Sequence, residues 1–461
     1  MRTHIIALAA ALAVATLAGC ANLAPSHERP AAPVAAAWSQ ASGGAETAQQ
    51  LDWQRFYSDA RLSALITLAL KNNRDLRVAL LNVEQARALA RVSDANRWPT
   101  VGVGVSGTRQ PNGNGDMTSN YQAGLQVSAY ELDLFGKLRD QSDAATQRYL
   151  ASAEGARAAQ ISLVAGVASG YLALQADEEL LQLTQQTLVT REESRRLTKL
   201  RFDQGAASSL DMSSADSALE AARAALAQAQ RQRAQDENAL TLLVGQSLPA
   251  ELPVAQPLRA QRLADVPSGI PSEVLVQRPD VLQAEALLAA ADANIGAARA
   301  AFFPSITLTT SLGTSSSELS GLFKNTAWSF ATQALMPIFD AGRNRANLDS
   351  TKAAREIAVA QYEKSIQSAF REVADALAGR ATLSEQLRAQ EAQALAEEQR
   401  MKLVELRYAN GASSSLELLD AQRASFAARQ AALQVRLAQL VNSVQLYKAL
   451  GGGAGLAPSK T

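Results

Sequence analysis

The 461-residue sequence contains almost none of the residues from which metal sites and histidine-dependent catalytic sites are built. Its two histidines, His4 and His27, lie near the N-terminus, and its single cysteine is Cys20. Zinc sites need several Cys or His ligands, and a Ser-His-Asp site needs a histidine beside its nucleophile. The many Asp and Glu residues on helical segments are typical of solvated surfaces. The sequence therefore predicts no enzyme, no metal and no cofactor.

An excess of charge of one sign is also absent. Lys and Arg together number 44, as do Asp and Glu, so the chain has no net field that would attract nucleic acid. Aromatic residues make up only 5% of the chain, although 47% is hydrophobic and much of that is alanine. Small side chains of this kind favour close packing between helices over a thick globular core.

Proline is absent from two long parts of the chain. None of the 14 prolines lies between Asn112 and Leu248 or between Ile338 and Ala457. Because proline removes a backbone donor and clashes with the preceding turn, these spans permit unusually long helices. A continuous helix from Leu138 to Phe202 would be ~98 Å long. Leucines recur every seven residues within it, as in a coiled coil: Leu174, Leu181 and Leu188.

One segment occurs twice. The sequence RFDQGAASSLDMSS, which starts at Arg201, returns as RYANGASSSLELLD, which starts at Arg407. Both contain a glycine suited to a turn between two helices, Gly205 and Gly411. We therefore expect two internal structural repeats, each with a helix, a β-hairpin and a long helical hairpin that turns at a tip.

The expected domain boundaries follow from this repeat. The first repeat covers 52–245, with its β-hairpin at 100–131 and its tip near 203–211. A proline-rich equatorial linker at 246–271 leads to the second repeat, which covers 272–451, with a β-hairpin at 305–337 and a tip near 409–417. A C-terminal tail covers 452–461. Within the first repeat, a helical pattern runs from Asp59 to Asn96 before Trp98-Pro99 ends it.

Three segments alternate apolar with polar or small residues, as half-exposed strands do, and a fourth, Ala327 to Pro337, is expected to be the returning strand of the second hairpin. Tyr121, Ala123, Leu125, Val127 and Ala129 share one face of the second of them. We expect Val103, Leu125, Ile306 and Leu308 to face lipid and Gln122, Gln126, Ser128 and Thr307 to face water. The first of the four contains Gly102-Val103-Gly104-Val105-Ser106-Gly107, which has the spacing of a phosphate loop. A strand that leads into a polar loop is the wrong context for one.

The N-terminus has the pattern of a signal peptide. Arg2 is followed by an apolar run from Ile5 to Leu17 that is too short to span a membrane, and residues 1–19 would be removed. Leu17-Ala18-Gly19-Cys20 resembles a bacterial lipobox, which implies acylation of Cys20. The alternative is a cysteine that falls by chance at an ordinary cleavage site. Residues 20–51, rich in Ala, Pro, Ser and Gly, would form a lipid-anchored tether.

Four strands are too few to form a membrane barrel. Backbone groups in a bilayer must all be paired, and outer-membrane barrels have at least about eight strands. Three chains would contribute twelve. The alternative at this point is a small soluble hairpin packed on helices.

Several motifs resemble those of one family. They are Asp52-Trp53, Asn72-Asn73-Arg74-Asp75-Leu76, Ile270-Pro271-Ser272, Arg278-Pro279-Asp280-Val281 and RYANGASSSLELLDAQR from Arg407. The sequence is similar to the outer-membrane factor family of TolC/OprM type, in its NodT-like efflux lipoprotein branch. The resemblance implies a mainly α protein with a membrane β part: a homotrimer whose 12-stranded β-barrel continues into a long α-helical coiled-coil periplasmic tunnel.

The resemblance also implies a function. Such proteins are passive exit channels of tripartite efflux systems, joined through a periplasmic adaptor (membrane fusion protein) to an inner-membrane transporter, here expected to be of RND type. Drug efflux is the first expectation, with metal-ion efflux and type I protein secretion as alternatives. A non-transport alternative is a lipid-anchored coiled-coil tether without a pore.

The site residues implied by the resemblance lie at the two tips. Leu416, Glu417 and Asp420 would line the periplasmic aperture, where three copies of each carboxylate would raise their pKa values or recruit cations. Tyr408 and Arg407 would reach toward Asp211 to hold the closed state, although Ser413 stands where some relatives have an arginine. The adaptor contacts would be Gly205, Ala206, Gly411 and Ala412. For the aperture carboxylates, the alternative is an ordinary solvated helix face. For the adaptor contacts, the alternative is that the glycines serve the turn geometry alone.

Overall fold

The computed structural model describes residues 23–35, 38, 51–266 and 272–453. The signal peptide and Cys20, with its expected acylation, lie outside these residues. The chain divides into two compact units, each described by itself. The sheet unit comprises Leu81–Glu154, Leu282–Ser365 and the described residues up to Ala32. The tip unit comprises the described residues of Pro33–Leu80, Gly155–Val281 and Ile366–Thr461.

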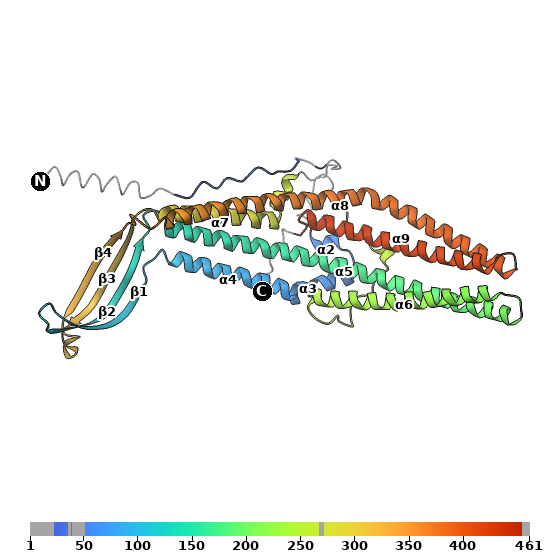
Figure 1. The fold of residues 1–461 in the computed structure, drawn as a ribbon, viewed down its shortest axis with the longest axis horizontal. Coiled ribbons are helices and arrows are strands. Elements are labelled where there is room, and N and C mark those ends of the chain that lie inside the picture. Colours follow the sequence, from blue (N-terminus) through green and yellow to red (C-terminus); the bar gives the residue numbers. More distant parts are fainter. Residues whose placement is uncertain (1–22, 36–37, 39–50, 267–271, 454–461) are drawn as a thin grey trace. The chain divides into compact units, whose positions relative to one another are not determined.

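A single antiparallel sheet forms the β part of the sheet unit (Figure 1). Its strands lie in sequence order: β1 Val101–Pro111, β2 Met117–Leu132, β3 Ser305–Ser316 and β4 Thr326–Leu335. The short 3₁₀ helix η4 Leu319–Gly321 lies between β3 and β4. Among the described strands, β1 and β4 each pair on one edge only, so the sheet has two open edges.

The strand register separates apolar from polar side chains. Directly opposed residues in antiparallel strands lie on the same face. One such row crosses all four strands and is apolar: Val103, Leu125, Leu312 and Trp328. A row on the opposite face contains Gln126, Ser311 and Ser329, and the two serine hydroxyls are 2.7 Å apart. The sheet is therefore amphipathic.

A β-bulge interrupts β2 near its C-terminal end. Val127 pairs with Thr310, but the next pair joins Tyr130 to Leu308. Two residues of β2 thus oppose one residue of β3, and Ala129 takes a positive φ of 50°. Regular alternation, predicted to continue through Ala129, stops at Val127 for this reason.

The helices of the sheet unit pack through small residues. They are parts of α4 Arg74–Ala95 and α7 Pro279–Ala300 and the N-terminal parts of α5 Lys137–Asp203 and α8 Arg343–Ala409. A buried cluster contains Ala144, Ala290 and Ala293. The N-terminal segment is bound here by ion pairs: Arg29 makes two 2.8 Å hydrogen bonds to Glu285.

The tip unit contains two helical hairpins (Figure 1). The first joins α5 to α6 Ser209–Val244, and the second joins α8 to α9 Ser415–Ala449. The remaining elements are α2 Trp53–Phe56, α3 Ala60–Asn72 and the 3₁₀ helices η2 Leu258–Ala260 and η3 Ser272–Gln277. Within the described residues one helix, α5, has a stretch long and apolar enough to cross a membrane; 56% of that stretch is buried, as in a core helix.

Two polar residues hold the tip unit together. Asp59 caps α3 and also accepts hydrogen bonds from the Tyr171 hydroxyl at 3.1 Å and the Gln261 amide at 2.6 Å. Arg278 is buried, with 6% of its surface exposed, and donates to Asp280, to Glu372 and to the carbonyl of Ala449. The conspicuous Arg-Pro-Asp-Val motif therefore connects the start of α7 with α8 and α9.

The prediction of one continuous helical segment from Asp59 to Asn96 is wrong in one respect, because the helix is interrupted at Asn73. This residue has extended backbone angles, and its side chain accepts from the Leu76 amide and donates to the Leu243 carbonyl. Asparagine competes well with helical hydrogen bonds through such local bonds. Two helices, α3 and α4, result.

Candidate functional site: the helical tips

The two tips have the same backbone geometry. In the first, the amides of Gly205 and Ala206 donate to the carbonyls of Phe202 and Arg201. In the second, the amides of Gly411 and Ala412 donate to the carbonyls of Tyr408 and Arg407. These bonds end α5 and α8 as a left-handed helix cap does.

The left-handed backbone explains the two glycines. Gly205 and Gly411 both have a φ of 74°, where side chains cause strain. A Cβ atom at either position would meet nothing within 4 Å, so crowding is not the reason for glycine. Both turns are exposed. The predicted adaptor contacts therefore lie on turns that are open to a partner.

The helices that follow the tips begin with matching caps. Ser208 accepts from the Asp211 amide, and the Asp211 carboxylate accepts from the Ser208 amide at 3.0 Å. In the second tip, Ser414 accepts from the Glu417 amide at 3.1 Å. Such caps fix where each helix begins. They also fix the orientation of the carboxylates that follow.

The predicted aperture residues lie in the first two turns of α9. Leu416 is 70% exposed. Glu417 accepts from the Ser413 hydroxyl at 2.8 Å and lies 3.8 Å from Arg407. Asp420 accepts from Arg423 at 2.7 Å and lies 3.5 Å from Arg400. Within one chain, both carboxylates thus have cationic neighbours, which the sequence alone did not predict.

The three residues predicted to hold the closed state make separate contacts. Tyr408 is buried against Val404, Leu418 and Ala421, and the Arg201 guanidinium lies 4.3 Å from the centre of its ring. Arg407 donates to the carbonyl of Ala412.

The third of these residues, Asp211, connects the two hairpins through a different partner. Its carboxylate accepts a hydrogen bond from the hydroxyl of Ser415 in the other hairpin. The hydrogen bonds from Ser415 and then Ser208 lower the pKa of Asp211 below the usual value for aspartate. Two contacts therefore connect the hairpins here: Arg201 with Tyr408, and Asp211 with Ser415. The predicted contacts from Arg407 and Tyr408 to Asp211 are not among them.

A third link between the hairpins is buried. The Arg191 side chain in α5 donates to the amide oxygen of Gln422 in α9 at 2.6 Å, and the Gln422 amide lies 3.4 Å from the Ser194 hydroxyl. Only 7% of Arg191 is exposed. Burial, and then the charge of Arg423, lower its pKa. No sequence pattern indicates that Arg191 has a functional role. Arg201 could have been recognised as a candidate, because it is the counterpart of Arg407 in the repeated segment.

These links lie beside a groove between the hairpins. Its volume is about 590 Å³, and its wall includes alanines of α6 and Leu416, Leu419 and Phe426 of α9. Arg191, Asp420 and Arg423 are its charged residues. Two of the predicted aperture residues, Leu416 and Asp420, therefore share one surface with Arg191 of the buried link.

Known proteins resemble this sequence over nearly the whole chain. The family model described as outer membrane efflux protein matches residues 65–246 and 270–452. The toluene efflux pump outer membrane protein TtgC of Pseudomonas putida is 47% identical, with 97% of this chain and 95% of the relative covered. The antibiotic efflux pump outer membrane protein ArpC of Pseudomonas putida has the same identity and coverage.

A solved structure agrees in fold. The open state of the Neisseria gonorrhoeae MtrE outer membrane channel superimposes with a TM-score of 0.86 at 41% identity and covers 94% of this chain and 99% of its own. The chain therefore belongs to the outer membrane efflux protein family and is an outer-membrane channel component of an efflux system.

Proposed function

We propose that three copies of this chain form one channel, in which the sheets join into a 12-stranded barrel and the helical hairpins continue it as a periplasmic tunnel. The observation that carries this proposal is the amphipathic sheet with two open edges. Its β1 and β4 edges leave backbone donors and acceptors unpaired, and a bilayer penalises each of these by several kcal/mol. Pairing β1 of one copy with β4 of the next would remove both edges.

The faces of the sheet support this assembly. Val103 is 80% exposed and Trp328 is 76% exposed in the single chain. Their shared row would face lipid, whereas the row with Gln126 and Ser311 would face the aqueous interior. Large aromatic residues near the strand ends, such as Trp98 at 70% exposure, fit the interfacial girdle of outer-membrane barrels.

Helix α4 supports an assembly of several copies. Three apolar residues of its sheet-unit part remain exposed in the single chain: Leu81 at 51%, Leu89 at 60% and Val92 at 59%. Soluble monomers rarely leave such a stripe uncovered. Packing against a neighbouring copy would bury it. The two-repeat organisation of 52–245 and 272–451 would then give the trimer six similar helical hairpins.

The tips would form the gated periplasmic end of the channel. Leu416, Glu417 and Asp420 from three copies would surround the aperture, and the links between hairpins would keep it closed. Gly205, Ala206, Gly411 and Ala412 would contact the adaptor, because both turns are exposed and preformed. An inner-membrane transporter of RND type would supply the energy, since the channel itself carries out no chemistry.

The cargo we propose is a small toxic solute, either a drug or an organic solvent. This assignment rests on relatives whose names specify toluene and antibiotic efflux. Acylation of Cys20 would add a lipid anchor, which the Arg29–Glu285 pair would connect to α7.

The direct test is the ion conductance of purified protein in planar bilayers. We expect discrete current steps, with a larger conductance when a link between hairpins is removed. If both the unmodified protein and the variants without these links insert into the bilayer but conduct no current, a tether without a pore would be favoured instead.

A further inference from the structure

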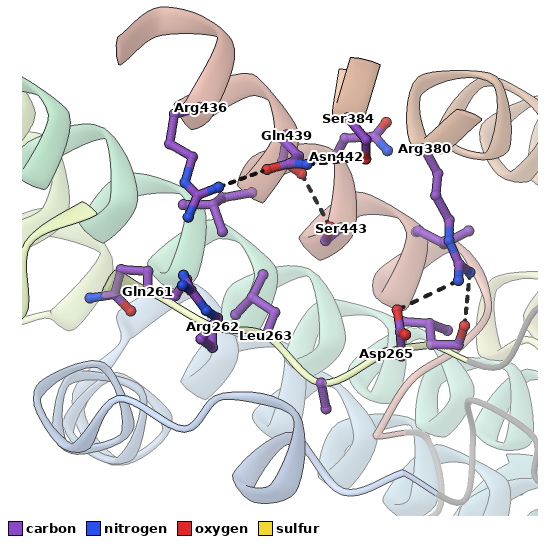
Figure 2. A pocket seen from close by; sticks show the side chains of 14 residues that line it. Gln261, Arg262, Leu263, Asp265, Arg380, Ser384, Arg436, Gln439, Asn442 and Ser443 are labelled. Atoms are coloured by element: carbon purple, nitrogen blue, oxygen red, sulfur yellow. Dashed lines mark hydrogen bonds and ion pairs between the residues drawn. The ribbon is translucent and has the colours of Figure 1, made fainter. Parts of the chain in front are cut away.

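A second surface of the tip unit carries an unusual concentration of arginine. Three arginines line one pocket of about 310 Å³, and they come from three separate segments: Arg262 from the linker, Arg380 from α8 and Arg436 from α9 (Figure 2). A pocket of this size lies at the lower limit for small-ligand sites. It shares no residue with the groove beside the tips.

The positive charge of this pocket is only partly balanced. Asp265 is the single carboxylate among its lining residues, its side chain is 97% exposed, and it lies 3.5 Å from Arg380. Three guanidinium groups and one carboxylate leave an excess of two positive charges. An arginine remains charged at any physiological pH, so protonation changes cannot remove this excess.

Apart from the 3.5 Å hydrogen bond from Arg380 to Asp265, the hydrogen bonds that these arginines make go to neutral acceptors. Arg262 donates to the carbonyls of Arg259 and Gln261, at 2.9 and 3.0 Å. Arg436 donates to the Arg259 carbonyl at 3.0 Å and to the Gln439 side chain at 3.3 Å. Arg380 donates to the Val266 carbonyl at 2.9 Å. These bonds orient the three side chains and fasten the linker, but they supply no negative charge.

One buried donor in the pocket has no acceptor. The Nε atom of Arg436 is shielded from solvent and has no hydrogen-bond partner among the described residues. Native proteins seldom leave a buried donor unpaired, because the group loses its hydrogen bonds to water and gains none in return. The Arg436 side chain would have to turn to present this donor to an acceptor in the pocket.

We propose that this pocket binds a phosphate group. A phosphate dianion would balance the excess of two charges, and a phosphodiester headgroup would balance one of them. Its oxygens also suit the planar forks of several guanidinium groups, which bind phosphate with paired hydrogen bonds. Ser384, Asn442 and Ser443, which also line the pocket, add neutral polar groups. The group could belong to free inorganic phosphate or to a phospholipid headgroup. Once bound, it would tie the linker to α8 and α9.

The test uses the purified full-length protein and isothermal titration calorimetry at constant ionic strength. One arm titrates inorganic phosphate, a second titrates short-chain phosphatidylglycerol below its micellar concentration, and a third titrates citrate. The variants are Arg380→Gln and Arg436→Gln. The matched control is Arg388→Gln, since Arg388 lies on the same helix α8, is exposed and pairs with Glu385 at 2.5 Å outside the pocket.

We expect saturable binding in the phosphate or the phosphatidylglycerol arm, at least tenfold weaker in both pocket variants and unchanged in the control. Whichever of these two arms binds identifies the source of the group. Equal binding by all variants, binding of citrate alone, or no saturable binding in any arm would overturn the proposal. The pocket variants should keep the conductance of the unmodified channel, so failure of this site and failure of the channel function can be told apart.

Discussion

Arg191 and Gln422 are 231 positions apart in the sequence, yet the guanidinium of one donates to the amide oxygen of the other across 2.6 Å inside the tip unit. A buried cation that is bonded to a neutral amide, with no carboxylate among its hydrogen-bond partners in the described chain, depends strongly on that amide. The pair connects the first helical hairpin to the second. It is therefore a natural point at which to test how the hairpins are held together.

Replacing Gln422 by leucine should destabilise the protein by about 1–3 kcal/mol, because it leaves the Arg191 guanidinium buried without its acceptor. The double variant Arg191→Met/Gln422→Leu should recover most of this loss, since apolar groups can replace both partners. Both changes should raise the channel conductance by unlinking the hairpins. Thermal unfolding and planar-bilayer recordings measure the two effects.

The control for this pair is Arg196→Gln. Arg196 lies on the same helix and is exposed, and its side chain donates to Glu193 one turn away. It should change neither the unfolding temperature nor the conductance noticeably. A double variant as unstable as Gln422→Leu alone would contradict our account of the pair.

The Asp211–Ser415 bond should make the channel sensitive to acid. Since the pKa of Asp211 in the folded protein is below the usual value, the bond contributes fully above about pH 3.9 and is lost as the pH falls through the lowered pKa. We expect conductance to rise in that acidic range. Ser415→Ala should raise conductance at pH 7 and reduce the acid response, whereas Ser209→Ala, at an exposed position next to the same tip, should do neither.

The two tip glycines should resist substitution. Gly411→Ala places a side chain at a φ of 74°, which costs about 1–2 kcal/mol. The turn should therefore fray, and amide hydrogen exchange from Arg407 to Glu417 should speed up several-fold. Gly113→Ala is the matched control, since a Cβ there also meets nothing within 4 Å and its φ is not positive. Equal exchange in the two variants would show that backbone strain is not what selects glycine at the tip.

A pair of carboxyl groups on α5 and α6 should make stability depend on pH. Burial, followed by a hydrogen bond to Asp236 and the charge of Asp236, raises the pKa of Asp177 to about 7. The folded protein thus holds a proton that the unfolded chain releases near pH 4, so stability should fall as the pH rises from about 4 to 7. Asp177→Asn should flatten this dependence and raise the unfolding temperature at pH 8. A parallel pH profile in the variant would refute this assignment.

The sequence predicted the elements of the fold well where a periodic signal was strong. The long proline-free helices and the four strands are present, because both patterns reflect burial on one face. The break at Asn73 and the bulge at Val127 were not predicted. Each depends on bonds to residues far away in the sequence, Leu243 for Asn73 and the β3 strand for the bulge.

The candidate site was only partly predictable for the same reason. The repeat and the resemblance directed attention to Gly411 and Asp211, which lie in the immediate neighbourhood of a turn. Arg191 and Gln422 carry no local signal, because their importance comes from meeting across two hairpins. The arginines of the linker pocket likewise become neighbours only in the folded chain.

The central claim is that one chain is incomplete and that three chains close the sheet into a barrel. Native mass spectrometry of the detergent-purified protein tests this most directly. We predict a complex of three chains, each close to the 48.7 kDa of the sequence apart from signal-peptide removal and acylation. A stable single chain, with both sheet edges still unpaired, would contradict the account.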